Sequence, residues 1–521
     1  MGHKDEENKG LSRRDFVRRA AAGLGAVALV GAASDAAGAY PVNRVRKWDE
    51  RADVVVLGTG AAGFVTAIVA HDLGAKVLII EKAPETHAGG NSRVAGQGFW
   101  SPLDVERVVE YQKGLDDGFP VSDDIVETFH RYAVGNAAWV KSMGGDGEPR
   151  PTGGEFPELP GAKGGGIVFP GKGPGYERFW KVLKDNVLKR RIRVLYQMAG
   201  TDLIQEAGTR EIRGVVANGK TCIRANRAVA LCTGGFENNQ EMIRDYLQMP
   251  CGYPKGTPYN TGDGIKMAMA AGADLWHMSN QAGPDFNFKA PGVDWAFGYV
   301  FAPVGGNGWI WVAKDATRFT NETYPTKHGK VPFHGIYVPL PTPLPVHLIF
   351  DETMRKSGPL YPPRTFFCWH SIVEHYEWSE DNSVELSKGW IVQGDTVGDL
   401  AIKIGKKPEA LQKTIANWNA SCATGNDAEF GRPAQKMAPI GSAPYYAMEL
   451  VPTFTNTQGG PRRNRLAQVL DTKGNPIPRL YSAGEMGSLF SWLYQGSGNL
   501  GECIVFGRIA GENAAKEKPW V

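Results

Sequence analysis

Cysteine is scarce in this chain of 521 residues. There are six cysteines, and no two of them stand in a C-x-x-C or C-x-x-C-H arrangement. Structural zinc sites and covalently attached haem need closely spaced ligands of this kind. The pattern therefore excludes both centres, and no metal site is expected. A disulfide stays open as an alternative, although the spacing names no pair.

A strong excess of one charge is also lacking. Lys and Arg number 58 against 55 Asp and Glu, which gives a net charge of +3, and beyond the N-terminus no stretch concentrates basic residues. Surfaces that bind nucleic acid depend on such concentrations. The composition therefore excludes a nucleic-acid partner. The length predicts two folded units and a leader rather than one domain.

The N-terminal leader has no hydrophobic run long enough to cross a membrane. The uncharged stretch Ala20–Ala33 is short and rich in Ala and Gly, whereas a spanning helix needs about 20 apolar residues. Arg13 and Arg14 precede this stretch, and Ala37-Gly38-Ala39 follows it. This order resembles a Tat export signal. We expect residues 1–39 to direct export of the folded protein to the periplasm or another extracytoplasmic place, without stable membrane insertion.

Glycine, by contrast, is abundant, with 66 residues. Many fall in short clusters, which read GTGAAG, AGGNS, KGGGI, CTGG, QGG and QGSG. Glycine has no Cβ and reaches positive φ without strain, so it suits loops whose backbone lies close to a ligand. The clusters indicate repeated close approach of the backbone to a large cofactor.

The clearest pattern is a dinucleotide-binding unit near the start of the mature chain. It reads, in order, as a buried strand (Val54–Leu57), a tight turn (Gly58–Gly63), a helix (Phe64–Leu73) and a second strand (Lys76–Ile80) that ends at Glu81. In such a unit Gly58 makes the turn, Gly60 leaves room for a pyrophosphate and Gly63 lets the helix pack on the strand. The pyrophosphate lies on the helix N-terminus, and Glu81 accepts the ribose hydroxyls.

Further motifs extend this unit across the chain. In order they are GGNS (Gly89–Ser92), TGG (Thr233–Gly235), NTGDGIKMAMAAGA (Asn260–Ala273), RFTNE (Arg318–Glu322) and SAGE (Ser482–Glu485). Together with the glycine turn and Glu81, they resemble the fumarate reductase and succinate dehydrogenase flavoprotein family. The resemblance runs from about residue 52 to the end.

The resemblance implies FAD as the cofactor, with Glu81 on the adenosine ribose and Glu485 on the ribityl side. The other cofactor contacts that it implies are Ala61, Ala62, Lys82, Gly90, Asn91, Ser92, Thr233, Gly234, Asp263, Gly484, Asn499 and Leu500. Gly496–Gly501 repeats the glycine spacing, but no second unit of strand, GxGxxG turn and helix is visible for a nicotinamide cofactor. An external electron carrier or a quinone is therefore the expected electron partner.

The resemblance also implies the architecture, an α/β fold in which a mixed α+β capping domain interrupts a Rossmann-like FAD-binding domain. The expected parts are residues 48–280 and 438–521 for FAD binding, and 281–437 for the cap. Residues 281–345 are rich in aromatics and prolines, and Thr396–Cys422 reads as two short helices. Both features fit an insertion.

The chain departs from the dicarboxylate reductases of this family at their substrate-binding positions. Where those enzymes have paired histidines, an arginine on the glycine loop and a proton-donating arginine, this chain has Thr455–Gly460, Asn499 and Thr326. Charge-assisted hydrogen bonds contribute roughly 1.5–3 kcal/mol each. Their loss would weaken the binding of a small dicarboxylate by orders of magnitude, so fumarate and succinate are disfavoured as substrates.

The stretch LYQGSGNLG resembles a different branch instead. Tyr494, followed four residues later by Gly498, matches the Y-x-G-x-G pattern of the 3-ketosteroid dehydrogenases. There the tyrosine hydroxyl and the glycine N–H hold the ketone oxygen of a neutral substrate, and two aimed donors stabilise enolate charge. For the proton partner the preferred residue is Tyr324, two positions after the RFTNE element, with His328 as the alternative.

We therefore expect an exported FAD-dependent oxidoreductase that forms or reduces a C=C bond conjugated to a carbonyl. In the dehydrogenation direction a base takes the proton next to the carbonyl and hydride goes to flavin N5. One alternative is a reductase of unsaturated carboxylates, in which Arg462, Arg463 or Lys327 would bind the anion. Another is a flavoprotein that only transfers electrons within a larger complex.

Overall fold

The computed structural model describes residues 38–170, 177–298, 305–323, 327–362 and 368–520. From Ala39 onward these residues form one compact unit. Residues 1–37 of the predicted export leader, and Tyr324, lie outside the described residues. No helix in the described part of the chain is long and apolar enough to cross a membrane.

A mostly parallel sheet carries the dinucleotide-binding unit. In spatial order its strands are β1 (Tyr40–Pro41), β7 (Gly200–Gln205), β8 (Ile212–Ala217), β9 (Thr221–Leu231), β2 (Glu50–Leu57), β3 (Val77–Ile80) and β6 (Arg193–Leu195). A hairpin of β22 (Gln468–Leu470) and β23 (Pro476–Ser482) joins it, with β23 parallel to β9. The C-terminal segment thus returns to the sheet that the N-terminal segment began.

Strand β2 is buried on both faces, which explains why its sequence is apolar without alternation. Val54 and Val56 belong to one buried cluster, with helices α2 (Ala61–Asp72) and α15 (Gly498–Lys516). Val55 and Leu57 belong to a second cluster, on the other face with α9 (Asp263–Ala270). Parallel sheets are covered on both faces, so all four residues are buried.

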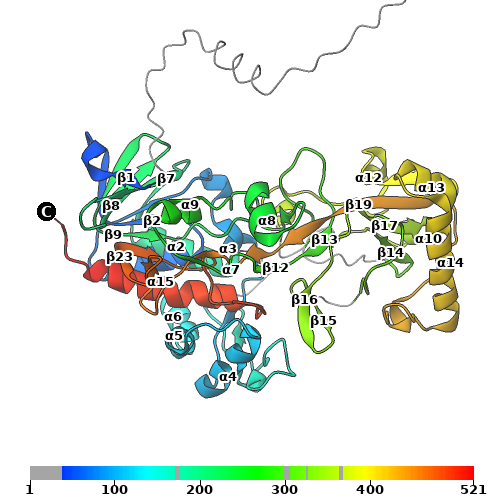
Figure 1. Ribbon diagram of the computed structural model, residues 1–521, viewed down its shortest axis with the longest axis horizontal. Helices are drawn as coiled ribbons and strands as arrows, with labels where there is room; N and C mark the ends of the chain where they lie inside the picture. Colours follow the sequence, from blue (N-terminus) through cyan, green and yellow to red (C-terminus); the bar gives the residue numbers. More distant parts are fainter. Residues whose placement is uncertain (1–37, 171–176, 299–304, 324–326, 363–367, 521) are drawn as a thin grey trace, which may run out of the picture. The chain divides into compact units, whose positions relative to one another are not determined.

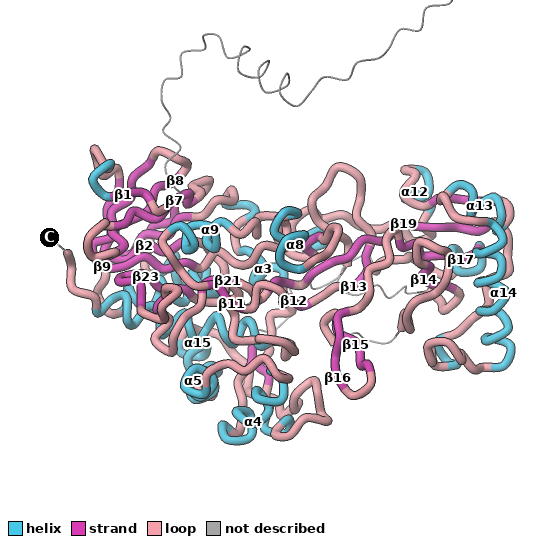
Figure 2. Tube along the Cα trace, viewed as in Figure 1, coloured by secondary structure: helices cyan, strands magenta, loops and turns pink. Residues whose placement is uncertain are grey.

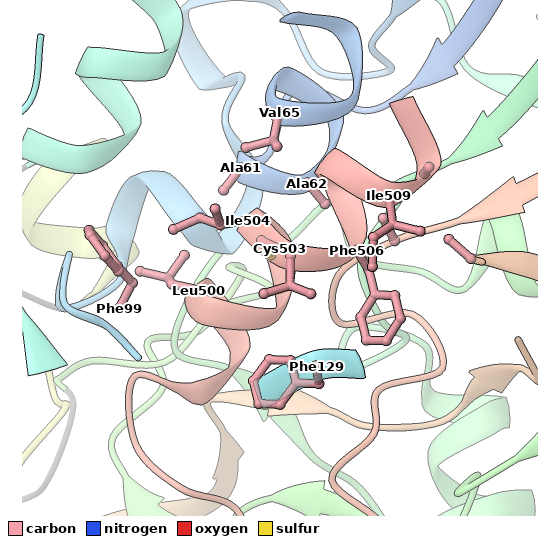
Figure 3. Packing of buried hydrophobic residues seen from close by; sticks show 14 of the residues in the cluster. Ala61, Ala62, Val65, Phe99, Phe129, Leu500, Cys503, Ile504, Phe506 and Ile509 are labelled. Carbon is pink, nitrogen blue, oxygen red and sulfur yellow. The ribbon is translucent and has the colours of Figure 1, made fainter. Parts of the chain in front are cut away.

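Helices α2 and α15 pack closely, as Figure 3 shows for Ala61, Ala62, Cys503 and Ile504. The close approach depends on small residues. A Cβ on Gly507 would lie 2.9 Å from Val65, and one on Gly511 would lie 2.6 Å from the Thr66 carbonyl oxygen. This contact fixes the first turn of α15, which follows the Tyr494 loop, against the helix of the glycine turn.

A second, mostly antiparallel sheet holds the middle of the chain (Figure 1). Its strands are β10 (Tyr253–Pro254), β13 (Asp285–Asn287), β14 (Trp309–Val312), β17 (Val346–Asp351), β18 (Val392–Gly394) and β19 (Tyr445–Phe454). The long strand β19 pairs with four of the others. The predicted boundary at residue 438 assigned this segment to the FAD-binding part, and the strand pairing places it in the second sheet instead.

Two helices cover one face of this sheet. Residues 396–422 form α13 (Val397–Lys403) and most of α14 (Pro408–Thr424), as predicted, although α14 is longer than expected. The Thr396 side chain caps α13 by accepting from the Asp399 amide, and Gly425 ends α14 at a φ of +65°. Leu400, Leu411 and Trp418 pack with Ile349 of the sheet.

The RFTNE motif forms a buried ionic network at the edge of the second sheet. Arg318 donates to both carboxylate oxygens of Glu322 at 2.8 and 2.9 Å and to both of Asp427 at 2.9 Å. All three side chains are at most 1% exposed. Paired in this way, the charges are tolerated inside the protein, and the network anchors the chain a few residues before His328.

Shorter elements complete the fold and are seen in Figure 2 as helix and strand segments between long loops. The remaining α-helices are α3 (Gly90–Val94), α4 (Val105–Asp116), α5 (Asp123–Ala133), α6 (Asn136–Ser142), α7 (Arg178–Lys189), α8 (Gln240–Leu247), α10 (Glu352–Lys356), α11 (Trp369–Ile372) and α12 (Ser383–Ser387). The remaining strands are β4 (Phe99–Trp100), β5 (Ile167–Val168), β11 (Leu275–Trp276), β12 (Gln281–Ala282), β15 (Lys330–Phe333), β16 (Ile336–Pro339), β20 (Asn456–Thr457) and β21 (Gly460–Pro461).

Candidate active site

An elongated channel opens at the carboxyl ends of four parallel strands. Residues that follow β2, β3, β9 and β23 all line it. The predicted cofactor residues in its lining are Gly58, Gly60, Ala61, Ala62, Glu81, Lys82, Gly90, Asn91, Ser92, Thr233, Gly234, Asp263 and Glu485. In open α/β sheets ligands bind at this edge. The fold thus brings together segments that are more than 400 positions apart.

The three glycines of the turn have three different surroundings. Gly58 has a φ of +102°, and a Cβ there would lie 2.4 Å from the Cys232 carbonyl oxygen. A Cβ on Gly63 would lie 2.0 Å from the Gly58 carbonyl oxygen. Gly60 lines the channel, and its nearest neighbour would be the Ser92 hydroxyl at 3.5 Å. Gly58 and Gly63 are therefore required by the fold, whereas Gly60 keeps the channel open.

Glu81 is held rigidly at the channel wall. One carboxylate oxygen accepts from the Thr59 amide at 2.9 Å and the Thr59 hydroxyl at 2.6 Å, and the other accepts from the Ala83 amide at 2.8 Å. Beside it, the Lys82 ammonium contacts Asp263 at 2.6 Å and the Thr261 hydroxyl at 2.6 Å. A fixed carboxylate and a helix N-terminus on one channel are the groups that a ribose and a pyrophosphate need. The site therefore fits FAD.

Asn91, from the GGNS motif, bridges two carboxyl groups. Its amide nitrogen donates to Glu237 at 2.6 Å and to Glu485 at 3.2 Å. Glu237 also accepts from Asn260 at 2.7 Å, and Glu485 accepts from the Gly235 amide at 3.0 Å. Glu237 was not predicted. It stands two positions after the TGG motif, and only the fold shows that it faces Glu485.

The Glu237 and Glu485 pair should make stability depend on pH. Burial, and then the neighbouring Glu237 carboxylate, raise the pKa of Glu485 well above its usual value, and burial also raises the pKa of Glu237. The folded protein therefore keeps a proton that the unfolded chain releases above about pH 4.3. Because the folded state then binds more protons, stability falls as the pH rises from there to the raised pKa of Glu485.

Glu237→Gln tests this dependence in the apoprotein. The amide keeps the hydrogen bonds from Asn91 and Asn260 and removes the like charge, so Glu485 ionises more easily. We expect a shallower decline of the melting temperature as the pH rises from about 5 toward the raised pKa of Glu485. A variant with the wild-type slope would show that the two carboxyl groups titrate independently.

A second cavity, of about 240 Å³, adjoins the channel. Asn91, Ser92, Glu485 and Cys503 line both spaces. The glycine-rich loop forms one wall of the cavity, with Tyr494, Gly496, Ser497, Asn499 and Leu500 in its lining. The predicted catalytic residues Tyr494 and His328, and the predicted cofactor residues Asn499 and Leu500, are therefore brought together in a cavity beside the channel.

Gly498 differs from the prediction. Its amide donates to the Gln495 carbonyl at 2.8 Å, which closes a turn, and Gly498 is absent from the lining of the cavity. A Cβ there would lie 2.3 Å from the Phe490 ring. The small size of Gly498 therefore serves packing. Gly63 and Gly484 likewise act behind the channel wall, since a Cβ on Gly484 would lie 2.8 Å from Ala62.

His328 packs against Tyr494 in the lining of the cavity. The two rings are 4.7 Å apart and nearly perpendicular. The His328 imidazole Nε2 lies 2.8 Å from a carboxylate oxygen of Glu155. Burial opposes ionisation of Glu155, but His328, the Gly496 amide and Lys327 outweigh it, so the pKa of Glu155 lies below its usual value. Glu155 belongs to no motif, and sequence reasoning missed it.

The cavity has little positive charge to offer an anion. No arginine is among the described residues that line it. Lys255 is 2% exposed and contacts Asp285 at 2.5 Å, and His328 is paired with Glu155. Arg462 contacts Asp274, Arg463 contacts Glu502, and neither arginine lines the cavity. The cations that an unsaturated acid would need are thus neutralised or placed elsewhere.

The comparisons with known proteins agree with this geometry. Residues 53–500 match the family model described as FAD binding domain. The fumarate reductase (cytochrome) of Shewanella frigidimarina is 30% identical over 483 residues, covering 89% of this chain and 77% of that protein. The 3-oxosteroid 1-dehydrogenase of Mycobacterium tuberculosis is 26% identical over 596 residues, covering 89% and 98%.

Among solved structures, the 3-ketosteroid Δ1-dehydrogenase of Sterolibacterium denitrificans, in complex with 1,4-androstadiene-3,17-dione, superposes with a TM-score of 0.73 at 25% identity. The match covers 89% of this chain and 99% of that one. The open conformation of a flavocytochrome c3 fumarate reductase gives 0.68 at 25% identity, covering 99% and 82%. The chain therefore belongs to the FAD binding domain family, and it is an FAD-dependent oxidoreductase that acts on carbon–carbon bonds.

Proposed function

We propose that this protein forms or reduces a C=C bond conjugated to a carbonyl on a neutral, cyclic ketone. The charge of the cavity carries the proposal. Among the described lining residues arginine is absent, Lys255 contacts Asp285, and the His328 imidazole lies against Glu155. A dicarboxylate entering such a space would lose its hydration without gaining ion pairs. A neutral substrate carries no charge whose hydration would have to be replaced.

Tyr494 is the proposed donor to the ketone oxygen. It is buried and lines the cavity, and its ring packs edge-to-face against the Phe490 ring, with the ring centres 5.2 Å apart. The amide of Asn499 lies 3.5 Å from the Tyr494 hydroxyl oxygen. A carbonyl oxygen within hydrogen-bond reach of both groups would meet two donors, as enolate charge requires. Asn499 thus takes the role that the sequence assigned to the Gly498 amide.

His328 is the proposed proton acceptor in dehydrogenation and the proton donor in reduction. Its imidazole stands beside Tyr494, so a carbon next to the bound carbonyl would lie within its reach. Imidazole titrates near neutral pH, which suits a general acid and base. FAD, when bound, supplies the two-electron acceptor or donor. Tyr324, which the sequence favoured as the proton partner, becomes the alternative to His328 in this proposal, and it lies outside the described part of the chain.

The second sheet and its helices are proposed to act as a capping domain. They contribute Lys255 from the β10 segment and Thr455 and Asn456 from the end of β19 to the cavity. Since one wall comes from this part and another from the Tyr494 loop, the cap would exclude water from the substrate. It would also set the size of the ketone that fits.

The proposed place of action lies outside the cytoplasm, with an external electron carrier or a quinone as the partner. The Arg13-Arg14 leader supports export through the Tat route. One relative carries a cytochrome in its name, and the chain has one dinucleotide motif, which FAD would occupy. Reducing equivalents must therefore leave or arrive through a second molecule.

A dye-reduction screen of purified, FAD-loaded protein tests the proposed function. Probes are 4-androstene-3,17-dione, simple cyclic ketones, and the acids succinate, fumarate, urocanate and cinnamate, with a reduced dye for the unsaturated compounds. We expect turnover with ketones or enones and none with the acids. Turnover confined to the acids would favour the carboxylate reductase, and no turnover of any compound would favour a protein that only transfers electrons.

A further inference from the structure

Glu155 contacts His328 and the loop that carries Tyr494, the two proposed catalytic residues. One carboxylate oxygen accepts from the Gly496 amide at 2.8 Å and contacts the His328 imidazole at 2.8 Å. The Glu155 amide donates at 2.9 Å to the Gln495 side chain, which also accepts from the Tyr111 hydroxyl at 2.7 Å. A single carboxylate is thus tied to the histidine and to the loop that carries Tyr494.

His328 is presented by a strained tight turn. His328 has a φ of +52° and Gly329 one of +80°, and Lys327 and Lys330 close the turn through backbone hydrogen bonds of 2.9 and 3.3 Å. A Cβ on Gly329 would lie 1.7 Å from the Gly283 carbonyl carbon, so the turn packs directly on another backbone. Left-handed conformations of bulky residues are costly and cluster at functional sites. The fold therefore fixes the backbone of the turn that carries the imidazole.

Lys330 anchors the far side of this turn. Its ammonium is buried, donates to the Asn280 side chain at 2.9 Å and lies 4.6 Å from the Trp492 ring centre. Burial lowers the pKa of Lys330 to about 7. The anchor lies behind the turn, away from the Glu155 carboxylate that faces its tip.

Exposure rises from the cavity toward the outside along this pair. The His328 side chain is 14% exposed and the Glu155 side chain 39% exposed. The imidazole Nδ1 makes no hydrogen bond to any described residue. The other titratable groups facing the pair are Lys327, which donates to the Glu155 carbonyl, Tyr111, which reaches Glu155 through Gln495, and Tyr494. A path for protons thus leads from the cavity to water.

We propose that Glu155 is the positioning residue and proton relay of His328. In dehydrogenation, the proton next to the carbonyl passes to Nδ1, and the electron pair of that C–H bond becomes the enolate. The proton on Nε2 then passes to the Glu155 carboxylate and from there to water. FAD, when bound, would supply the acceptor for the hydride of the neighbouring carbon, and the enolate electron pair would then form the C=C bond. In reduction every step runs backwards. The relay rests on the proposed function.

Glu155→Gln tests the relay in the FAD-loaded protein. The probe is 4-androstene-3,17-dione, or the ketone that the dye screen selects, and the readout is the rate of flavin bleaching without oxygen across pH. We expect normal FAD content, a rate lower by about a hundredfold, and an altered pH dependence of the rate, because the group that accepts the imidazole proton is gone. The solvent deuterium isotope effect should increase.

Glu158→Gln is the matched control. Glu158 lies on the same loop and accepts from the Tyr337 hydroxyl at 2.5 Å, without lining the cavity. Its replacement should leave rate and pH profile unchanged. Should Glu155→Gln lose FAD, His328→Gln decides instead, with a rate loss of about a hundredfold and no acid limb expected.

The outcomes separate the two proposals. An unchanged pH profile in Glu155→Gln, or in His328→Gln where that variant decides, overturns the relay while the proposed function stands. A wild-type flavin that no ketone bleaches and no enone reoxidises overturns the proposed function and the relay with it.

Discussion

Tyr494→Phe should lower turnover on the true ketone substrate by about a hundred- to a thousandfold, the usual result of removing one donor to an oxyanion. The ring keeps its contacts with Phe490 and His328, 5.2 and 4.7 Å away. Folding and FAD content should therefore barely change. Turnover is measured with a dye acceptor at saturating substrate, and the flavin spectrum and melting temperature report on the fold.

Tyr337→Phe is a suitable control for this variant. It removes a tyrosine hydroxyl that donates to Glu158 and does not line the cavity, so turnover should stay close to that of the wild type. Equal activity in Tyr494→Phe and Tyr337→Phe would reduce Tyr494 to a packing residue. The assignment to ketone chemistry would then lose its main support.

Gly60→Val should give a folded protein that binds FAD more weakly than the wild type. Gly60 has a φ of −65° and open space beside it, so a side chain fits the backbone but projects into the channel. Crowding at a close contact costs about 1–3 kcal/mol, so FAD affinity should fall by up to roughly a hundredfold. The measurement pairs FAD titration with thermal unfolding of the apoprotein.

Gly63→Ala should behave in the opposite way. Its Cβ would lie 2.0 Å from the Gly58 carbonyl oxygen, on the side away from the channel. The variant should therefore melt at a lower temperature even without FAD. A normal flavin spectrum in Gly60→Val would mean that the cofactor lies elsewhere, whatever Gly63→Ala does.

Sequence reasoning succeeded where the relevant contacts are local. The glycine turn and Glu81 lie within one strand–helix–strand unit, so their spacing alone predicts the geometry that the structure shows. The two helices between residues 396 and 422 were found for the same reason, because caps and apolar spacing are local signals.

Contacts between distant segments could not be predicted in this way. Glu155 meets His328 and Gly496, which lie 173 and 341 positions away, and no motif marks it. Strand β19 pairs with β13, β17 and β18 of the second sheet. These partners come from an earlier part of the chain, so no local pattern shows the pairing. The Gly498 amide is a third case. The family pattern predicted that this N–H is free to bind the substrate, but in the structure it donates to the Gln495 carbonyl within a turn.

The most direct test of the account is flavin bleaching without oxygen in the wild-type protein. The FAD-loaded enzyme is mixed with a ketone such as 4-androstene-3,17-dione or with succinate, and the loss of visible flavin absorbance is followed. The chemically reduced enzyme is then mixed with an enone or with fumarate, and the return of absorbance is followed. The account predicts a response to ketone or enone and none to succinate or fumarate. Rapid bleaching by succinate and rapid reoxidation by fumarate, with no response to ketone or enone, would contradict the assignment to ketone chemistry.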